Sequence, residues 1–135
     1  MNMDAKQRFE VRLHPDVIKE YYKLDNSILP IVNKAIDELE FRADEVGKPL
    51  GNKHNSKLAG CKEIKLRDAG IRIIFRITNE RVDILRIVYI LAIERRSNDF
   101  VFQVASKRLK NFKNSSKAHQ EDYLNKIDKW NEYRN

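Results

Sequence analysis

The chain has 135 residues, 35% of them charged and 41% hydrophobic, with four glycines and three prolines. This composition is typical of one globular domain and excludes a collagen-like or disordered chain. The net charge is +7, and the single cysteine, Cys61, excludes an intrachain disulfide and a multi-cysteine metal site. The N-terminus is polar and no apolar run approaches the ~18 residues of a membrane span, so a cytoplasmic protein without membrane contact is expected.

The positive charge is unevenly distributed along the chain. Residues 51–76 carry a net +5 and residues 101–135 a net +4, whereas residues 1–50 carry a net −2. A polyanion such as RNA or DNA would be attracted to the two basic segments. A basic surface that is only solvated is the alternative explanation of the same charges.

The N-terminal third predicts a strand followed by two helices. Apolar and charged side chains alternate over residues 8–13, which is the period of a half-buried strand. Pro15 and Asp16 favour a helix start, and the polar residues 25–27 end this first helix. A longer amphipathic helix follows over residues 28–42, so a helical hairpin is expected.

The rest of the chain predicts strands and then helices. After a loop over residues 47–56, strands are expected at 61–67, 71–78 and 82–92, with turns at 68–70 and 79–80. A helix from residue 97 or 98 to 109, a polar linker over 111–118 and a last helix over 121–133 complete the prediction. The fold class is therefore α+β: the N-terminal strand and the helical hairpin pack on one face of a four-stranded, mainly antiparallel sheet, and C-terminal helices follow.

The first predicted hairpin has a definite register. If its turn pairs Leu66 with Ile71 on the core face, Lys65 lies opposite Arg72 on the other face, with Arg67 nearby. A slip by one residue would bury these cations, so the register is well determined. Like charges opposite each other on a sheet are unfavourable unless an anion lies between them. Long side chains that spread into solvent are the alternative.

The second predicted hairpin is less regular. With Asn79 and Glu80 as a two-residue turn, Arg76 lies opposite Asp83, a favourable cross-strand pair. The same register puts Arg86 on the apolar face, where it either reaches solvent at an edge or is reoriented by a bulge.

Two segments resemble the RelE/ParE toxin superfamily. Residues 58–77 read LAGCKEIKLRDAGIRIIFRI, which is similar to the central hairpin of that family, L-x-G followed by K-I-K-L-R-x-x-G-Y-R-L-V-Y. Residues 94–108 read ERRSNDFVFQVASKR and resemble the family pattern G-K-R-E-x-x-x-V-Y-x-x-A-x-x-R. The resemblance extends over roughly residues 8–109, so residues 1–110 are expected to be a RelE-like toxin domain.

The resemblance implies a function and partners. A RelE-like toxin of a type II toxin–antitoxin system is a metal-independent endoribonuclease that cleaves mRNA on the ribosome, arrests translation and needs no cofactor. Its expected partners are a cognate antitoxin, the ribosome and mRNA, with DNA operators contacted only through the antitoxin. The cleavage is attack of a ribose 2′-OH on the adjacent phosphate, which needs a base, stabilisation of the phosphate charge, and an acid.

The resemblance also implies site residues. Lys65 matches the second lysine of K-I-K-L-R and is the candidate base, because neighbouring cations favour a neutral amine. Arg72 matches the arginine that clamps phosphate, for which a guanidinium is well suited. Arg96 matches the arginine six residues before the aromatic position and is the candidate charge stabiliser or acid. Residues expected to bind RNA are Lys53, Lys57, Arg67, Arg95 and Phe102.

Two positions depart from the family pattern. Glu63 replaces the first lysine of K-I-K-L-R, and Phe102 replaces the tyrosine, so a hydroxyl group is missing although the ring could stack on a base. These departures leave two alternatives open. One is a ParE-like toxin that inhibits DNA gyrase without catalysis, and the other is an inactive relative that only binds an antitoxin.

Residues 111–135 extend beyond the family resemblance and are expected to form a linker and an amphipathic helix. Tyr123, Ile127 and Trp130 lie at helical spacing, with Leu124 beside them. We expect this stripe to dock on the body of the protein. Docking on the open face of the sheet would cover the basic pair and act as a brake, whereas docking on the helical hairpin would be structural only.

Overall fold

The computed structural model describes residues 6–52 and 57–134. The elements in chain order are β1 (Phe9–Leu13), α1 (Pro15–Tyr22), α2 (Leu29–Arg42), β2 (Lys48–Gly51), β3 (Leu58–Leu66), β4 (Ile71–Val82), β5 (Leu85–Arg95), α3 (Val101–Lys113), α4 (Lys117–Lys126), β6 (Asp128–Lys129) and α5 (Trp130–Tyr133). The predicted strand, helical hairpin, three strands and following helix are all present. Pro15 is the first residue of α1, as the sequence predicts.

The described strands form one sheet in the order β2-β3-β4-β5-β1-β6. β1 runs parallel to β5, and the other neighbouring strands are antiparallel. The predicted α+β class is confirmed, but the sheet has six strands rather than four. The two additional strands are short edge strands: β2 lies in the predicted loop, and β6 lies in the predicted last helix. Periodicity does not reveal such short strands, since they hold too few residues to show an alternation.

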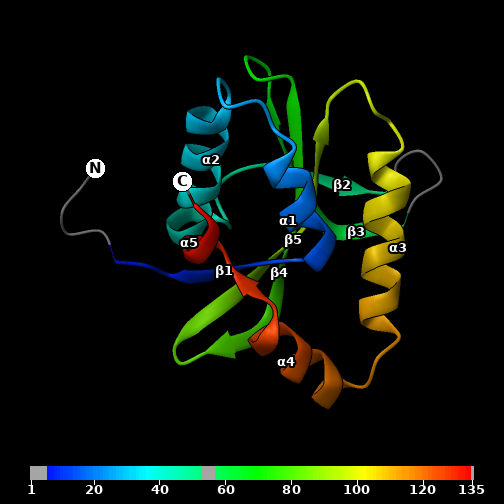
Figure 1. Cartoon of the computed structure of the whole chain (residues 1–135). Helices are drawn as coiled ribbons and strands as arrows, with labels where there is room; N and C mark the ends of the chain where they lie inside the picture. The colour runs from blue at the N-terminus through cyan, green and yellow to red at the C-terminus, as the bar shows by residue number, and fades with distance from the viewer. Residues whose placement is uncertain (1–5, 53–56, 135) are drawn as a thin grey trace.

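Helices cover both faces of the sheet, and the helical hairpin packs on one of them, as predicted (Figure 1). α1 and α2 bury the face that carries Val88 and Ile90, and α3 buries the face that carries Ile87 and Leu91. Residues 87–93 of β5 are apolar without interruption, which is the composition of a strand buried on both sides.

The β3–β4 hairpin has the predicted register. Leu66 pairs with Ile71 and Lys65 with Arg72. Gly70 closes the turn with φ of +67°, a left-handed conformation that glycine adopts without steric cost, and its N–H donates to the carbonyl oxygen of Arg67 at 3.2 Å. The alternation of apolar and charged residues thus fixes which side chains share a face.

The β4–β5 hairpin turns later than predicted. β4 continues to Val82, the turn falls at Asp83 and Ile84, and Arg76 pairs with Tyr89 rather than with Asp83. Asp83 takes the left-handed conformation, with φ of +54°. Two register shifts interrupt the ladder, one of them between residues 77 and 81. Assigning side chains to the two faces by strict alternation along the strand therefore gives the wrong result here, because each bulge moves the following side chains to the other face.

The predicted linker is mostly helical. α3 continues to Lys113 and α4 begins at Lys117, so only residues 114–116 of the predicted linker at 111–118 lie between the helices. Ser116 caps α4 by accepting a hydrogen bond from the backbone N–H of His119 at 3.1 Å. This cap is the reason that the helix begins at Lys117, before the predicted start at residue 121.

The C-terminal segment crosses from one face of the sheet to the other. Tyr123 on α4 shares a 2.7 Å hydrogen bond with Tyr89 on the α3 side. β6 then pairs with β1, and Trp130, 1% exposed, packs with α1 and α2 on the opposite side. Buried Arg12 donates to carbonyl oxygens at the end of α4. The segment docks on the body of the protein, as expected. Tyr123 and Ile127 pack on the α3 side of the sheet and Trp130 on the opposite side, so the stripe does not lie over Lys65 and Arg72.

Among residues 6–52 and 57–134 no helix combines the length and the apolar character needed to span a lipid bilayer.

Candidate active site

Lys65 and Arg72 lie side by side on neighbouring strands, on the face of the sheet that α3 covers. The Lys65 side chain is 31% exposed, whereas the Arg72 side chain is 9% exposed. Lys65 can therefore reach solvent directly, while only part of the Arg72 guanidinium is accessible. We call Glu63, Lys65, Arg72 and Phe102 the hairpin site.

Glu63 supplies an anion between the two cations. Its carboxylate lies 3.5 Å from Lys65 Nζ and 3.0 Å from Arg72 Nε, and the residue is 2% exposed. The 3.0 Å contact is an ion pair whose atoms are not aligned for a hydrogen bond. Sequence reasoning identified Glu63 only as a departure from the family pattern. The parity of β3, which puts Glu63 and Lys65 on one face, was the signal for its contact.

Arg72 is covered on its other sides by residues at the start of α3. The Phe102 ring lies 4.7 Å from the guanidinium carbon in a cation–π contact, and Asp99 Oδ1 lies 4.0 Å from Nη1. Phe102 is 2% exposed, so Arg72 and the core occupy the surface on which a base was expected to stack. The Asp99 side chain is 72% exposed and can separate from Arg72 at little cost.

Arg95 and Arg96 lie where β5 ends beside the β3–β4 turn. Arg95 pairs with Ile71 in the ladder, and the backbone N–H of Arg96 donates to the carbonyl oxygen of Gly70 at 2.9 Å. Arg96 is thereby held close to the strand that carries Arg72. Within the described part of the chain its side chain forms no ion pair, and its buried Nε has no hydrogen-bond partner.

The remaining predicted RNA-binding residues are dispersed. Arg67 is exposed in the β3–β4 turn. Lys57 is exposed before β3, where its backbone N–H donates to Ser106 on α3 at 3.2 Å. Lys53 lies outside the described residues. The structure therefore brings Lys65 and Arg72 together and places Arg67 and Arg96 at the same end of the hairpin.

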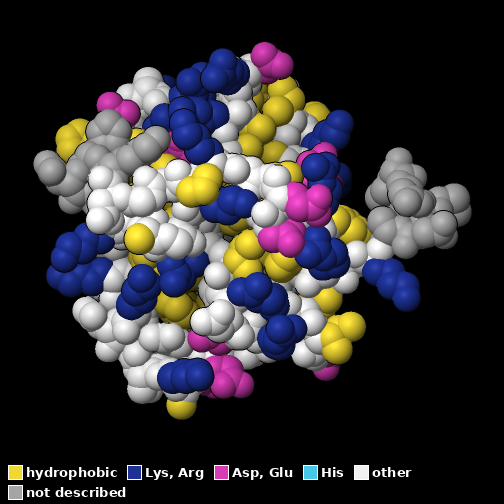
Figure 2. Space-filling view, turned by 180° about the vertical axis from the view of Figure 1, so that it is seen from behind, with side chains coloured by type: hydrophobic (Ala, Val, Ile, Leu, Met, Phe, Trp, Pro, Cys, Tyr) yellow, Lys and Arg dark blue, Asp and Glu magenta, His cyan; other side chains and the backbone are white. Residues whose placement is uncertain are grey.

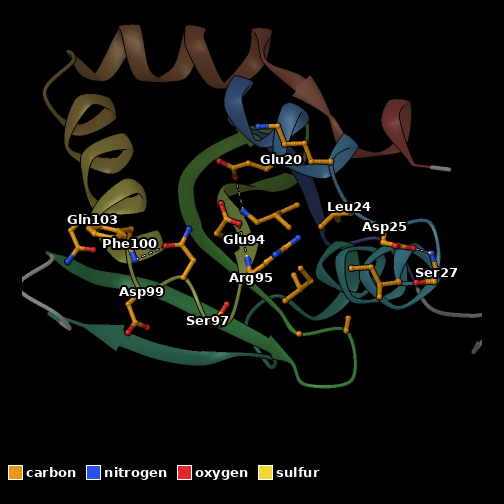
Figure 3. Close-up of a pocket in the computed structure, with 17 residues that line it drawn as sticks. Glu20, Leu24, Asp25, Ser27, Glu94, Arg95, Ser97, Asp99, Phe100 and Gln103 are labelled. Atoms are coloured by element: carbon orange, nitrogen blue, oxygen red, sulfur yellow. Dashed lines mark hydrogen bonds between the residues drawn. The ribbon is translucent and has the colours of Figure 1, made fainter.

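An open groove of about 1320 Å³ adjoins the hairpin site at the end of β5. Figure 3 shows Glu20, Glu94 and Arg95 around its middle, with Asp99 and Phe100 at one end. Phe100 is 76% exposed. Asp99 belongs both to this groove and to the cover of Arg72.

Neither a metal site nor a cysteine nucleophile accompanies these residues in the described part of the chain. No group of three or more His, Cys, Asp or Glu side chains there could hold a metal ion. Cys61 is 1% exposed, and burial raises the pKa of its thiol. A buried thiol that stays protonated is a packing residue.

Lys and Arg side chains are spread over the surface in several groups, as the face seen in Figure 2 shows, with acidic side chains among them. The exposed side of α3 carries Lys107, Lys110 and Lys113, and the helix contains no acidic residue. The exposed side of α3 is thus favourable for a polyanion.

Comparison with known proteins identifies the family. No family model matches the chain. An Escherichia coli protein named as RelE-like toxin is 30% identical over 108 residues, which cover 76% of this chain and 99% of that protein. The mRNA interferase toxin RelE of Escherichia coli K12 is 27% identical over 93 residues, 68% of this chain and 87% of the relative.

Solved structures agree with this relationship. The free form of an Escherichia coli RelE variant with two arginines replaced by alanine superposes with a TM-score of 0.59 at 23% identity, over 77% of this chain and 99% of the other. The RelBE2 toxin–antitoxin complex of Mycobacterium tuberculosis contains a chain with a TM-score of 0.50 and 28% identity, over 66% of this chain and 99% of the other.

The fold is that of solved toxins of the RelE kind. With a 30% identical relative matched over nearly its whole length, the chain belongs to the RelE-like toxin family. The predicted family resemblance is therefore confirmed.

Proposed function

We propose that this chain is the toxin of a toxin–antitoxin pair and an endoribonuclease that cleaves mRNA on the ribosome. The observation that carries the proposal is the pairing of Lys65 with Arg72 beside Arg96, in a family whose relatives are named mRNA interferases. The basic exposed side of α3 favours RNA as substrate.

The proposed chemistry is an internal transfer at the RNA phosphate. The 2′-oxygen attacks the adjacent phosphorus, its proton leaves to a base, and the 5′-oxygen leaves with a proton from an acid. Lys65 is the proposed base; its amine reaches solvent, so the proton that it carries beside Glu63 can leave before the reaction. Arg72 and Arg96 are the proposed stabilisers of charge on the phosphate oxygens, and Arg96 is also the candidate acid.

Arg72 must become accessible for this role. Its guanidinium is mostly covered, and the exposed carboxylate of Asp99 is the part of the cover that can leave most readily. An RNA phosphate that approaches Arg72 would replace Asp99 as the anionic partner. Phe102, which lacks a hydroxyl group, supports the guanidinium in this proposal and moves no proton.

Partners and cellular location follow from the same proposal. A RelE-like chain in the Mycobacterium tuberculosis structure is part of a toxin–antitoxin complex, and we infer a cognate antitoxin for this chain. Action on translating mRNA implies the cytoplasm and requires contact with the ribosome. An antitoxin with an acidic segment would neutralise the basic surface and exclude RNA.

We also propose that residues 1–110 are the toxin domain and residues 111–135 an extension of it. The Escherichia coli RelE-like relative supports this division, because it matches over 108 residues whereas this chain has 135. The extension is proposed to be structural, since its contacts lie on α2, β1 and β5.

The decisive experiment is the mapping of mRNA 5′ ends after induced expression of the wild type and of Arg72→Ala. The wild type should stop growth and create new 5′ ends in translated mRNA, and Arg72→Ala should reduce cleavage by at least about 100-fold. Arg81→Ala is the matched control, because it removes an exposed arginine from the other end of β4.

Three other outcomes would contradict the proposal. Growth arrest with intact mRNA and a DNA-damage response would indicate a ParE-like action on gyrase. Equal cleavage by Arg72→Ala would remove Arg72 from the mechanism. Absence of toxicity from the wild type, with antitoxin binding retained, would indicate an inactive relative.

A further inference from the structure

We propose that Glu63 is a positioning residue of the hairpin site, whose carboxylate holds Lys65 and Arg72 where they meet the RNA phosphate. This inference rests on the proposed function and deepens it. Glu63 does not touch the substrate in this proposal, because the residue is 2% exposed. It acts through its two cationic neighbours.

The contacts of Glu63 divide between the two cations. One carboxylate oxygen, Oε1, lies 3.5 Å from Lys65 Nζ, and the other, Oε2, lies 3.0 Å from Arg72 Nε. Neither oxygen has a hydrogen-bond partner among the described residues. A buried carboxylate without hydrogen bonds is costly unless ion pairs compensate it. The two ion pairs are therefore the interactions that compensate the burial of the Glu63 carboxylate.

The arrangement also explains why the two cations can lie opposite each other. Lys65 and Arg72 are direct cross-strand partners, and like charges at such positions repel. Glu63 lies on the same face as Lys65, two residues before it, and its negative charge offsets that repulsion. Without this charge the Lys65 side chain would be free to swing into solvent.

Arg72 depends on Glu63 more than on its other contacts. Asp99 is 4.0 Å away and largely exposed, so it restrains the guanidinium weakly. The Phe102 ring supports one face of the guanidinium at 4.7 Å but does not orient its N–H groups. Glu63 is the buried anion on Nε, and fixing Nε determines where the remaining N–H groups point.

The test compares two Glu63 variants in cleavage of ribosome-bound mRNA by the purified protein. Glu63→Gln keeps the shape and removes the charge, and it should lower kcat by at least about 10-fold while KM changes by less than about three-fold. Glu63→Asp keeps the charge with a shorter reach, and it should lower kcat by about two- to five-fold. Combining Glu63→Gln with Arg72→Ala should give a smaller loss than the product of the two single losses, because part of the effect of Glu63 passes through Arg72.

Glu94→Gln is the matched control. Glu94 is the ladder partner of Arg72 on β5, so this variant removes a negative charge next to the same arginine. Glu94 makes no ion pair with Arg72 in the described part of the chain, and its Oε1 accepts the backbone N–H of Arg95. Its kcat should stay within about two-fold of the wild type.

Wild-type or higher kcat in folded Glu63→Gln would overturn the inference and indicate that Glu63 only masks charge. Equal losses in Glu63→Gln and Glu94→Gln would overturn it too, since charge rather than position would then be responsible. If Glu63→Gln does not fold, a folded Glu63→Asp with wild-type kcat overturns the inference. Intact mRNA with the wild type would instead refute the proposed function.

Discussion

Asp37 and Trp130 are joined by a hydrogen bond, with Nε1 of the indole 2.8 Å from the carboxylate across 93 positions of sequence. The same carboxylate accepts from Arg134 Nε at 2.7 Å. Residues 130–134 are thus attached to α2 by hydrogen bonds. Trp130, the only tryptophan of the chain, is buried against α1, with its ring centroid 5.3 Å from that of Tyr21.

We predict that Asp37→Ala loosens this C-terminal attachment. Loss of the carboxylate leaves the buried indole N–H without its acceptor, which should lower the free energy of unfolding by about 1–3 kcal/mol. Tryptophan fluorescence should shift to longer wavelength as the ring gains contact with water. Glu38→Ala on the same helix is the control, because among residues 6–52 and 57–134 Glu38 pairs only with Arg42, one turn away. An unchanged emission maximum in Asp37→Ala would show that packing alone holds the tryptophan.

Asp99→Asn tests whether the exposed carboxylate competes with RNA for Arg72. Removal of its charge frees Nη1, so kcat/KM for mRNA should rise by about two- to five-fold. Asp83→Asn is the control at the far end of β4, where asparagine also tolerates the positive φ of 54°. A decrease in kcat/KM for Asp99→Asn would mean that the carboxylate assists the reaction instead.

The sequence predicted the β3–β4 hairpin well because its signals are local. Apolar and charged residues alternate on both strands, and Gly70 fixes the turn, so the Lys65–Arg72 pair follows from parity alone. The prediction of the β4–β5 hairpin was wrong because the alternation of side chains carries no information about bulges. Its bulges shift the register, and the turn is made by Asp83, whose left-handed backbone is not a strong sequence signal.

Long-range contacts explain what the sequence did not reveal about the site. Glu63 and Phe102 could be recognised as departures from the family pattern. The contact of Phe102 with Arg72 arises only when α3 packs over the hairpin, whereas the contact of Glu63 with Arg72 lies within the hairpin itself. The stripe on the C-terminal segment likewise predicted that Tyr123 and Trp130 are buried. It could not predict that they bury against opposite faces, because periodicity does not identify the partner surface.

Glu40 should make the protein less stable as the pH rises. Burial, with Asp37 and Glu10 nearby, raises the pKa of Glu40 from 4.5 to about 7. The folded protein therefore holds this proton more tightly than the unfolded chain, and its stabilising effect is present below pH 4.5 and is lost as the pH rises through 7. At pH 8 the free energy of unfolding of Glu40→Gln should be higher than that of the wild type by about 1 kcal/mol, after allowance for solvent screening of a half-exposed group.

Denaturant unfolding at several pH values checks this prediction. The advantage of Glu40→Gln should shrink as the pH falls from 8 towards 5, where the wild-type carboxyl group is also protonated. Glu45→Gln, an exposed surface change near the end of α2, is the control. An advantage that is equal at pH 5 and pH 8 would show that the gain comes from packing and not from ionisation.

His14 should have the opposite effect, with stability falling as the pH falls. Burial, and then the positive charge of Arg108, lower the pKa of His14 from 6.5 to about 4. The unfolded chain therefore takes up the proton first, so the contribution of His14 is present above pH 6.5 and is lost as the pH falls towards 4.

The variant His14→Asn tests this prediction. At the start of α1, His14 Nδ1 accepts a hydrogen bond from the backbone N–H of Asp16 at 3.0 Å. Asparagine removes the titratable group and keeps a side-chain acceptor for this N–H. As the pH falls from 7.5 to 4.5, the free energy of unfolding of this variant relative to the wild type should rise by about 1 kcal/mol, with screening of the partly exposed ring taken into account. His119→Asn, which removes the same titratable group from an exposed position of α4, is the control. A constant difference between His14→Asn and the wild type over this pH range would show that burial does not keep His14 neutral.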